Sequence, residues 1–109
     1  MTELVAYCSV PDAETAARLA RVLVEERLAA CVSRVPGVVS TYRWQGRVCV
    51  DEECLLLIKT TEARLAALRE RLVALHPYAV PELIAVPVVA GHAPYLDWLR
   101  AQVADAPAD

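Results

Sequence analysis

The stretch Cys54-Leu55-Leu56-Leu57-Ile58-Lys59-Thr60 decides the fold of this chain. Its first five residues are apolar without interruption, which is typical of a central strand covered on both faces. We predict that this strand begins at Arg47 and ends at Thr60. Thr60 and Thr61 are then candidates for the N-cap of a following helix, with the acidic Glu62 in its first turn.

A second long strand is predicted just before this one, over residues 31–44. Pro36-Gly37 interrupts it, so we expect this strand at an edge of the sheet or with a bulge. Gln45-Gly46 separates the two strands and predicts a tight hairpin. Because Gln is unfavourable at the first position of a type I′ turn, we expect a type I turn with Gly46 in the left-handed conformation.

The start of the chain predicts another strand and a helix. Residues 4–10 are rich in β-forming side chains. Asp12 is a strong N-cap, and we expect a helix from there to about Arg27. The apolar residues at helical spacing that form its buried stripe are Ala16, Leu19, Ala20 and Leu23.

The second half of the chain predicts two helices and a strand. The helix after Thr61 is expected to end at His76, because Pro77 disfavours helical geometry in the residue before it. Residues 83–89 predict a strand, and Pro87 favours a place at the sheet edge. Pro94 fits the first turn of a last helix. The buried stripes of the two helices are Leu65, Leu68, Leu72 and Leu75, and Leu96, Leu99 and Val103.

The predicted order is β-α-β-β-α-β with an added C-terminal helix, which is the ferredoxin-like pattern of the α+β class. Right-handed crossovers give the sheet order 4-1-3-2, with the two proline-containing strands at the edges. We predict a single domain over residues 1–109, in which residues 104–109 form a frayed tail.

One face of this sheet lacks helices in the predicted fold. The apolar run at residues 54–58 requires cover on that face as well, so we predict that another subunit lies against it. The alternative is that the last helix folds across the open face and keeps the chain monomeric.

Composition and charge exclude several classes of protein. Hydrophobic residues make up 57% of the chain, which excludes disorder, and no apolar stretch is long enough to span a membrane. The formal net charge is −3, and acidic and basic residues alternate along the chain, so we expect no nucleic-acid partner. The N-terminal residues show no signal-peptide pattern, so we expect a cytoplasmic protein.

Cys8 and His76 are the strongest candidates for chemistry. The predicted topology brings both to one end of the domain, and a thiolate with an imidazole suits copper or zinc. Two ligands are too few for a closed site, so the others would come from Glu82, water or another subunit. Cys-His catalysis is the weaker alternative, and His76 can instead simply complement the helix dipole. The four cysteines form no Cys-x-x-Cys pair and are expected to be free thiols.

Two further features remain open from the residues alone. Lys59 is the single lysine, and it either meets an anion or is a solvated surface residue. Trp44 beside the hairpin turn either contacts a partner subunit or closes a cleft. An acylphosphatase-like hydrolase on this topology would need an asparagine, and the sequence contains none, so we predict that the chain is not an enzyme.

Seven short motifs resemble the CutA divalent-cation tolerance family. They occur in the family's order between about Val5 and Trp98, and so cover nearly the whole chain. The motifs are Leu28-Ala29-Ala30-Cys31-Val32, Pro36-Gly37-Val38, Tyr42-Arg43-Trp44-Gln45-Gly46, Leu57-Ile58-Lys59-Thr60, His76-Pro77-Tyr78, Val80-Pro81-Glu82 and Tyr95-Leu96-Asp97-Trp98.

The resemblance implies a ferredoxin-like homotrimer that responds to divalent metal ions, with copper as a ligand and no required cofactor. In copper-binding members of the family, the ligands are a cysteine late in the first strand and two adjacent histidines. Cys8 matches the cysteine and His76 the second histidine, whereas Leu75 replaces the first. The family trimer is also similar to the PII signalling proteins, which bind small anionic ligands between subunits. By that analogy the intersubunit cleft residues are Trp44, Lys59, Tyr78, Glu82 and Trp98.

Overall fold

In the computed structural model, residues 2–104 are described, and they form one four-stranded antiparallel sheet and three helices. The predicted tail at 104–109 lies outside this range except for Ala104. The elements in chain order are β1 (Glu3–Val10), α1 (Ala13–Glu25), β2 (Cys31–Trp44), β3 (Arg47–Thr61), α2 (Glu62–Leu75), β4 (Ile84–Pro87) and α3 (Ala93–Val103).

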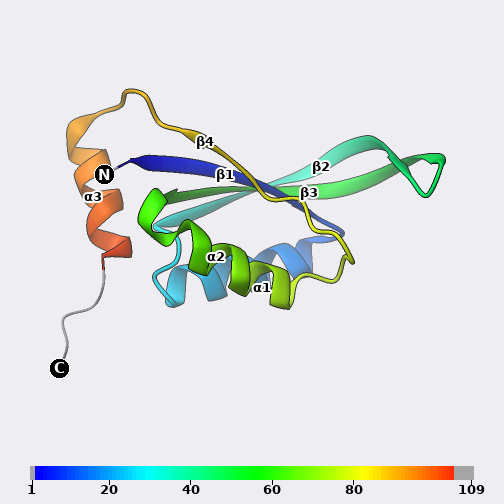
Figure 1. Ribbon diagram of the computed structural model, residues 1–109, viewed down its shortest axis with the longest axis horizontal. Helices are drawn as coiled ribbons and strands as arrows, with labels where there is room; N and C mark the ends of the chain where they lie inside the picture. Colours follow the sequence, from blue (N-terminus) through cyan, green and yellow to red (C-terminus); the bar gives the residue numbers. More distant parts are fainter. Residues whose placement is uncertain (1, 105–109) are drawn as a thin grey trace.

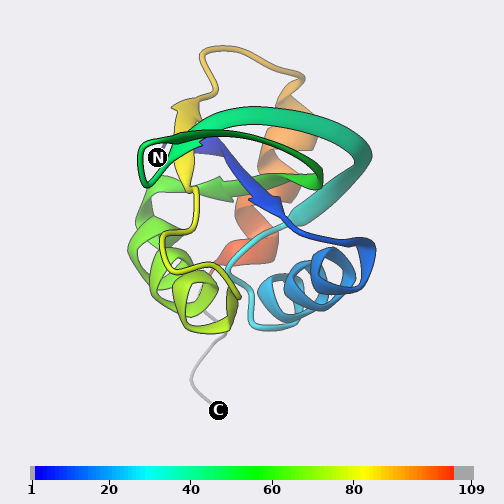
Figure 2. The same ribbon diagram turned by 90° about the vertical axis from the view of Figure 1, so that its right-hand side faces the viewer.

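The sheet order is β2-β3-β1-β4, which confirms the predicted ferredoxin-like α+β topology. α1 and α2 lie side by side against one face, while α3 lies at one end of the sheet (Figures 1 and 2). The proline-containing strands β2 and β4 are at the edges, as predicted. A register shift between Val35 and Val38 confirms the expected bulge at Pro36-Gly37. No helix within residues 2–104 is both long and apolar enough to cross a membrane.

Two elements are shorter than predicted. α1 ends at Glu25 rather than near Arg27, because Arg27 adopts a left-handed backbone conformation with φ 59°. β4 covers four residues rather than residues 83–89. Beyond Pro87, the Val88 N–H still donates to the Glu3 carbonyl oxygen, but the chain then leaves the sheet and Val89 is almost fully exposed.

The predicted type I turn at Gln45-Gly46 is wrong. Gln45 has φ 51° and Gly46 has φ 76°, so both central residues are left-handed, as a type I′ turn requires. Trp44 pairs directly with Arg47, which leaves a two-residue loop. The twist of the long hairpin therefore outweighs the free-energy cost of positive φ at Gln45.

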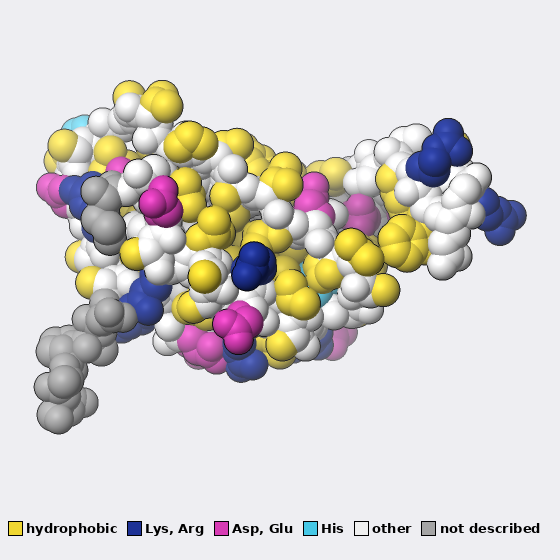
Figure 3. Space-filling view, viewed as in Figure 1, with side chains coloured by type: hydrophobic (Ala, Val, Ile, Leu, Met, Phe, Trp, Pro, Cys, Tyr) yellow, Lys and Arg dark blue, Asp and Glu magenta, His cyan; other side chains and the backbone are white. Residues whose placement is uncertain are grey.

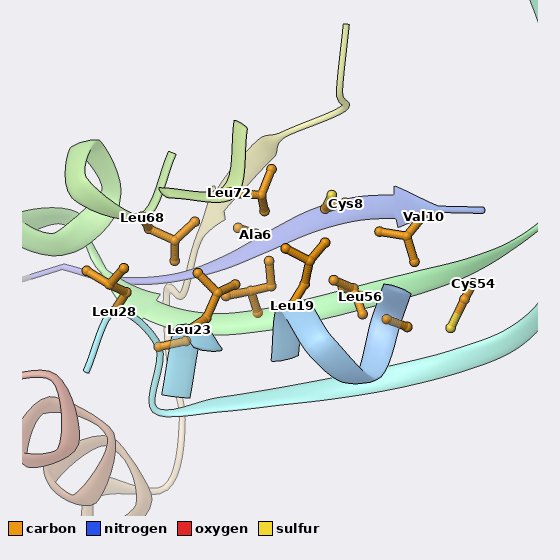
Figure 4. Packing of buried hydrophobic residues seen from close by; sticks show 13 residues of the cluster. Ala6, Cys8, Val10, Leu19, Leu23, Leu28, Cys54, Leu56, Leu68 and Leu72 are labelled. Atoms are coloured by element: carbon orange, nitrogen blue, oxygen red, sulfur yellow. The ribbon is translucent and has the colours of Figure 1, made fainter. Parts of the chain in front are cut away.

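The core lies between the sheet and the α1–α2 layer (Figure 4). Alternate residues of β1 and β3 point toward the two helices and are fully or almost fully buried, and Leu19 and Leu23 of α1 pack against them. From β1 and β3 the core contains Ala6, Cys8, Val10, Cys54, Leu56 and Ile58, and from α2 it contains Leu68 and Leu72.

The opposite face of the sheet is only partly covered. α3 packs there at one end through Leu99 and Val103, and Arg100 forms an ion pair with Glu3 at 2.7 Å. Leu55 and Leu57 remain partly exposed. The alternative in which the last helix covers this face is therefore realised at one end of the sheet only.

Beyond the helices, β2 and β3 continue as a projecting hairpin, which we call the arm (residues 38–53; Figure 1). Val39, Val48 and Val50 on the arm are 61–63% exposed. Figure 3 shows hydrophobic side chains spread over this side of the molecule and basic side chains at the tip of the arm. An apolar surface of this kind on a projecting hairpin is typical of a protein–protein contact.

Candidate functional site

Cys8 and His76 lie at the end of the sheet from which the arm projects, as the topology predicted. Cys8 is near the end of β1, and His76 follows the last residue of α2. Both contact one atom, the carbonyl oxygen of Ser9: His76 Nε2 is 2.9 Å away and Cys8 Sγ is 3.7 Å away. We call this region, with Glu53, Tyr78 and Glu82, the acidic end.

The thiol of Cys8 is not poised to bind a cation as it stands. Its side chain is fully buried among the core residues. Burial raises the pKa of Cys8 to about 12, and the negative charges of Glu82 and Glu53 add to this effect. The thiol is therefore protonated at neutral pH, whereas the form that binds metals is the thiolate.

His76 is held by hydrogen bonds at both ring nitrogens. Nε2 donates to the Ser9 carbonyl oxygen, and Nδ1 accepts from the backbone N–H of Tyr78 at 3.1 Å. This pattern fits the neutral ring with its proton on Nε2. The side chain is 7% exposed, and its ring lies 4.7 Å from the ring of Tyr78. In this state neither nitrogen has a free lone pair directed at solvent.

The sequence did not predict two phenol–carboxylate pairs, one at the acidic end and one on the adjoining arm. Tyr78 donates a hydrogen bond of 2.5 Å to Glu53, whose side chain is 8% exposed, and Tyr42 donates to Asp51. Burial and the bond to Glu53 raise the pKa of Tyr78, and the bond to Asp51 raises the pKa of Tyr42 to about 12.

The signal for one of these pairs was in the strand register. Tyr42 pairs with Cys49, so Asp51 lies two residues further along β3 on the same face, within reach of a tyrosine side chain. Tyr78 lies in a loop far from Glu53 in sequence, and only the tertiary fold brings these two together.

The acidic end does not form a closed metal centre within one chain. Among residues 2–104, no three His, Cys, Asp or Glu side chains are grouped so that they could hold one ion. Leu75 occupies the position before His76, and it packs against the core without any donor atom. Any metal bound here needs water or groups from another chain to complete its coordination.

Lys59 lies at the opposite end of β3, next to α3. Its ammonium donates to the Ser33 hydroxyl at 2.6 Å and lies 3.9 Å from the sulfur of Cys31. We call these three residues the lysine end. Lys59 and Glu53 are six positions apart on one strand, or about 20 Å at the usual rise per residue.

The five predicted cleft residues therefore do not form one cleft in a single chain. Tyr78 and Glu82 lie at the acidic end and Lys59 at the lysine end. Trp44 is at the tip of the arm and 44% exposed. Trp98 is on α3, where it packs against Tyr95 with ring centroids 5.5 Å apart. A cleft that contains all five requires more than one copy of the chain.

Comparison with known proteins gives a consistent result. The family model "CutA1 divalent ion tolerance protein" matches residues 4–102. The "divalent-cation tolerance protein CutA" of Thermus thermophilus is 56% identical over 98 residues, which cover 90% of this chain and 95% of that protein. A chloroplastic "Protein CutA 1" of rice is 50% identical over 97 residues, and this chain spans only about half of its length, 55%.

Solved structures show the same similarity. The crystal structure of rice CutA1 superposes with a TM-score of 0.93 at 45% identity and covers 97% of both chains. The Thermus thermophilus divalent cation tolerance protein superposes with a TM-score of 0.90 at 55% identity, covering 92% of this chain and 97% of that chain.

Proposed function

This chain belongs to the CutA1 divalent ion tolerance family, and we propose that it acts, without catalysing a reaction, as a homotrimer in the tolerance of divalent metal ions. The observation that supports the metal role is the acidic end. There a thiol, an imidazole and the carboxylates of Glu53 and Glu82 are gathered around the end of one strand. Such a concentration of negative charge attracts cations.

We further propose copper as the ion, with Cys8 and His76 as its ligands. A sulfur and an imidazole nitrogen form a donor set that binds copper in preference to harder metal ions. The geometry sets conditions on this binding: Cys8 must lose its proton, and His76 must release one of its two hydrogen bonds. We therefore expect copper binding that strengthens as the pH rises and that requires ligands from a second chain or from solvent.

Copper titration followed by native mass spectrometry tests the ligand set. The variants are Cys8→Ser and His76→Gln, and the matched control is Cys49→Ser, which removes a half-buried thiol on the arm. We expect bound copper to disappear in the first two variants and to persist in the control. An unchanged copper stoichiometry in Cys8→Ser and His76→Gln would show that neither residue is a copper ligand.

The homotrimer is supported by the partly exposed apolar side chains of β3 and of the arm. Leu55, Leu57, Val48 and Val50 lose contact with water only if other copies cover them. Light scattering at micromolar concentration should give about three times the 11.9 kDa chain mass. A single-chain particle would contradict this part of the proposal. Val50→Asp on the arm should weaken the assembly, whereas Glu52→Asp beside it should not.

We place the protein in the cytoplasm, where thiols stay reduced. All four cysteines are free in the structure, which fits a reducing compartment. Fractionation of the native organism with an antibody against the chain tests the assignment. Recovery with an organelle or the periplasm would contradict it; the rice relative is named as chloroplastic.

The alternative function is a PII-like module that binds a small anionic metabolite between subunits. It is favoured by Lys59, whose ammonium contacts, among residues 2–104, a hydroxyl and a thiol and no carboxylate, which suits contact with an anion. A thermal-shift screen of anionic metabolites on metal-free protein separates the two functions. A stabilising ligand that loses its effect in Lys59→Met would favour the alternative.

A further inference from the structure

The lysine end holds an amine and a thiol in unusual proximity. Cys31 of β2 and Lys59 of β3 are directly paired across the two strands. Lys59 Nζ lies 3.9 Å from Cys31 Sγ and 2.6 Å from Ser33 Oγ, and the two β2 side chains are themselves 4.0 Å apart. The hydroxyl of Ser33 therefore anchors the lysine nitrogen beside the sulfur.

Cys31 differs from the other three thiols of the chain. Cys8 and Cys54 are buried in the core. Cys49 is half-buried like Cys31, but its contact is the backbone carbonyl oxygen of Arg47. Among the hydrogen-bond contacts of residues 2–104, Cys31 is the thiol with a side-chain amine against its sulfur. It is also partly exposed, so that a small oxidant can reach it.

We propose that Cys31 and Lys59 form a peroxide-sensitive pair that closes into a covalent sulfur–nitrogen cross-link. First, hydrogen peroxide transfers one oxygen to Cys31: an S–O bond forms, the O–O bond breaks, and the second oxygen leaves as water. Then Lys59, after giving a proton to solvent, attacks the oxidised sulfur. An S–N bond forms, the S–O bond breaks, and the oxygen leaves as water. Sulfur is oxidised by two electrons, and one peroxide is reduced.

The cross-link also changes the charge of the protein surface. Lys59 carries the ammonium of the lysine end, and attachment to sulfur removes its positive charge. Since the two residues are already paired across strands, the bond forms with little movement of the backbone. The reaction does not use the proposed copper ligands: Cys8 pairs with Leu56, three positions from Lys59 and about 10 Å along the strand, and its side chain is buried in the core. Loss of copper binding and loss of the cross-link are therefore separate outcomes.

Peptide mass spectrometry of the peroxide-treated, assembled protein tests the proposal. The protein is quenched with catalase, alkylated and digested with trypsin without reductant. Cleavage at arginine leaves Cys31 in peptide 28–34, and a blocked Lys59 leaves peptide 48–64 uncut. We expect these two peptides joined, with their summed mass lowered by two hydrogen atoms, and released by dithiothreitol.

Four variants make the result specific. Lys59→Arg retains the positive charge and should abolish the cross-link. Ser33→Ala should lower its yield, whereas Ser40→Ala, also half-buried on β2, should not. Cys49→Ser should leave the yield unchanged. The proposal is overturned if trypsin still cleaves after Lys59 while Cys31 is oxidised to acids or a disulfide, or if the cross-link persists in Lys59→Arg.

Discussion

The two halves of β3 are one continuous strand with opposite environments. Residues 54–60 alternate between buried and half-buried positions beneath α1 and α2. Residues 47–52 of the same strand form the arm and are exposed, apart from the half-buried Cys49. Both halves pair with β2, over residues 47–53 and 55–59. The difference shows that strand pairing is enough to extend the hairpin into the arm. Burial of side chains against the helices stabilises only the covered half.

The candidate chemistry lies where the two halves meet. Glu53 is the last arm residue, and it is buried where Tyr78, from the loop after α2, donates a hydrogen bond to it. A carboxylate at that boundary is shielded enough from water for its charge to raise the pKa of the buried Cys8 thiol. It is also near enough to solvent to contact a cation. The acidic end is thus a product of the strand leaving its helical cover.

Two truncations on β3 should show the largest difference in stability between its covered half and the arm. Leu56→Ala removes a fully buried side chain from the covered half and should lower the free energy of unfolding by about 2–5 kcal/mol. Val50→Ala on the arm should cost well under 1 kcal/mol within the chain, because Val50 is 61% exposed. Urea unfolding at one fixed protein concentration measures both. Equal losses of unfolding free energy would show that the arm is as tightly packed as the covered half, which would contradict the difference between them.

The next largest effect is expected at the boundary. His76→Ala leaves the Ser9 carbonyl and the Tyr78 N–H without their side-chain partners and opens a cavity, for an expected loss of about 2–3 kcal/mol. The control is His92→Ala, since His92 is exposed and caps α3 without a side-chain hydrogen bond. The same urea experiment should show a negligible change there. If His76→Ala leaves the free energy of unfolding unchanged, water replaces both hydrogen bonds.

The covered half is also closed at its far end by an ion pair, which predicts a pH dependence. The hydrogen bond and charge of Arg100 prevail over burial and hold the pKa of Glu3 below 4.5. A lowered folded-state pKa adds stability that is present above pH 4.5 and is lost as the pH falls through the folded value.

Arg100→Met should therefore reduce stability at pH 7 and flatten the acid limb of the stability profile. Chemical unfolding between pH 7 and pH 3 follows the difference between the two proteins, which should shrink toward the acid end. Arg21→Met is the control, because its pair with Glu25 is largely exposed and contributes little. A difference independent of pH would assign the role of Arg100 to packing.

Most of the fold could be predicted because its causes are local. Asp12 accepts from the Thr15 N–H at 2.7 Å as an N-cap should, and α2 ends before Pro77 as the proline demands. The acidic end could be predicted only in outline. Strand direction places Cys8 near His76, but the bonds that occupy both ring nitrogens come from the backbone of Ser9 and Tyr78, which side-chain identity does not encode.

The turn of the arm was missed because its cause is not local, and it gives the smallest expected effect. Gln45 has φ 51°, a conformation that costs Gln more than Asn. Gln45→Asn should therefore stabilise the hairpin by about 0.5 kcal/mol, in line with gains at turn positions whose backbone suits the new residue. Gln102→Asn, on α3 with ordinary helical geometry, should not stabilise. Thermal unfolding at fixed concentration resolves the sign. If Gln45→Asn is destabilising, then Gln45 makes a contact in the assembly that outweighs its backbone strain, and the arm tip belongs to an interface between copies.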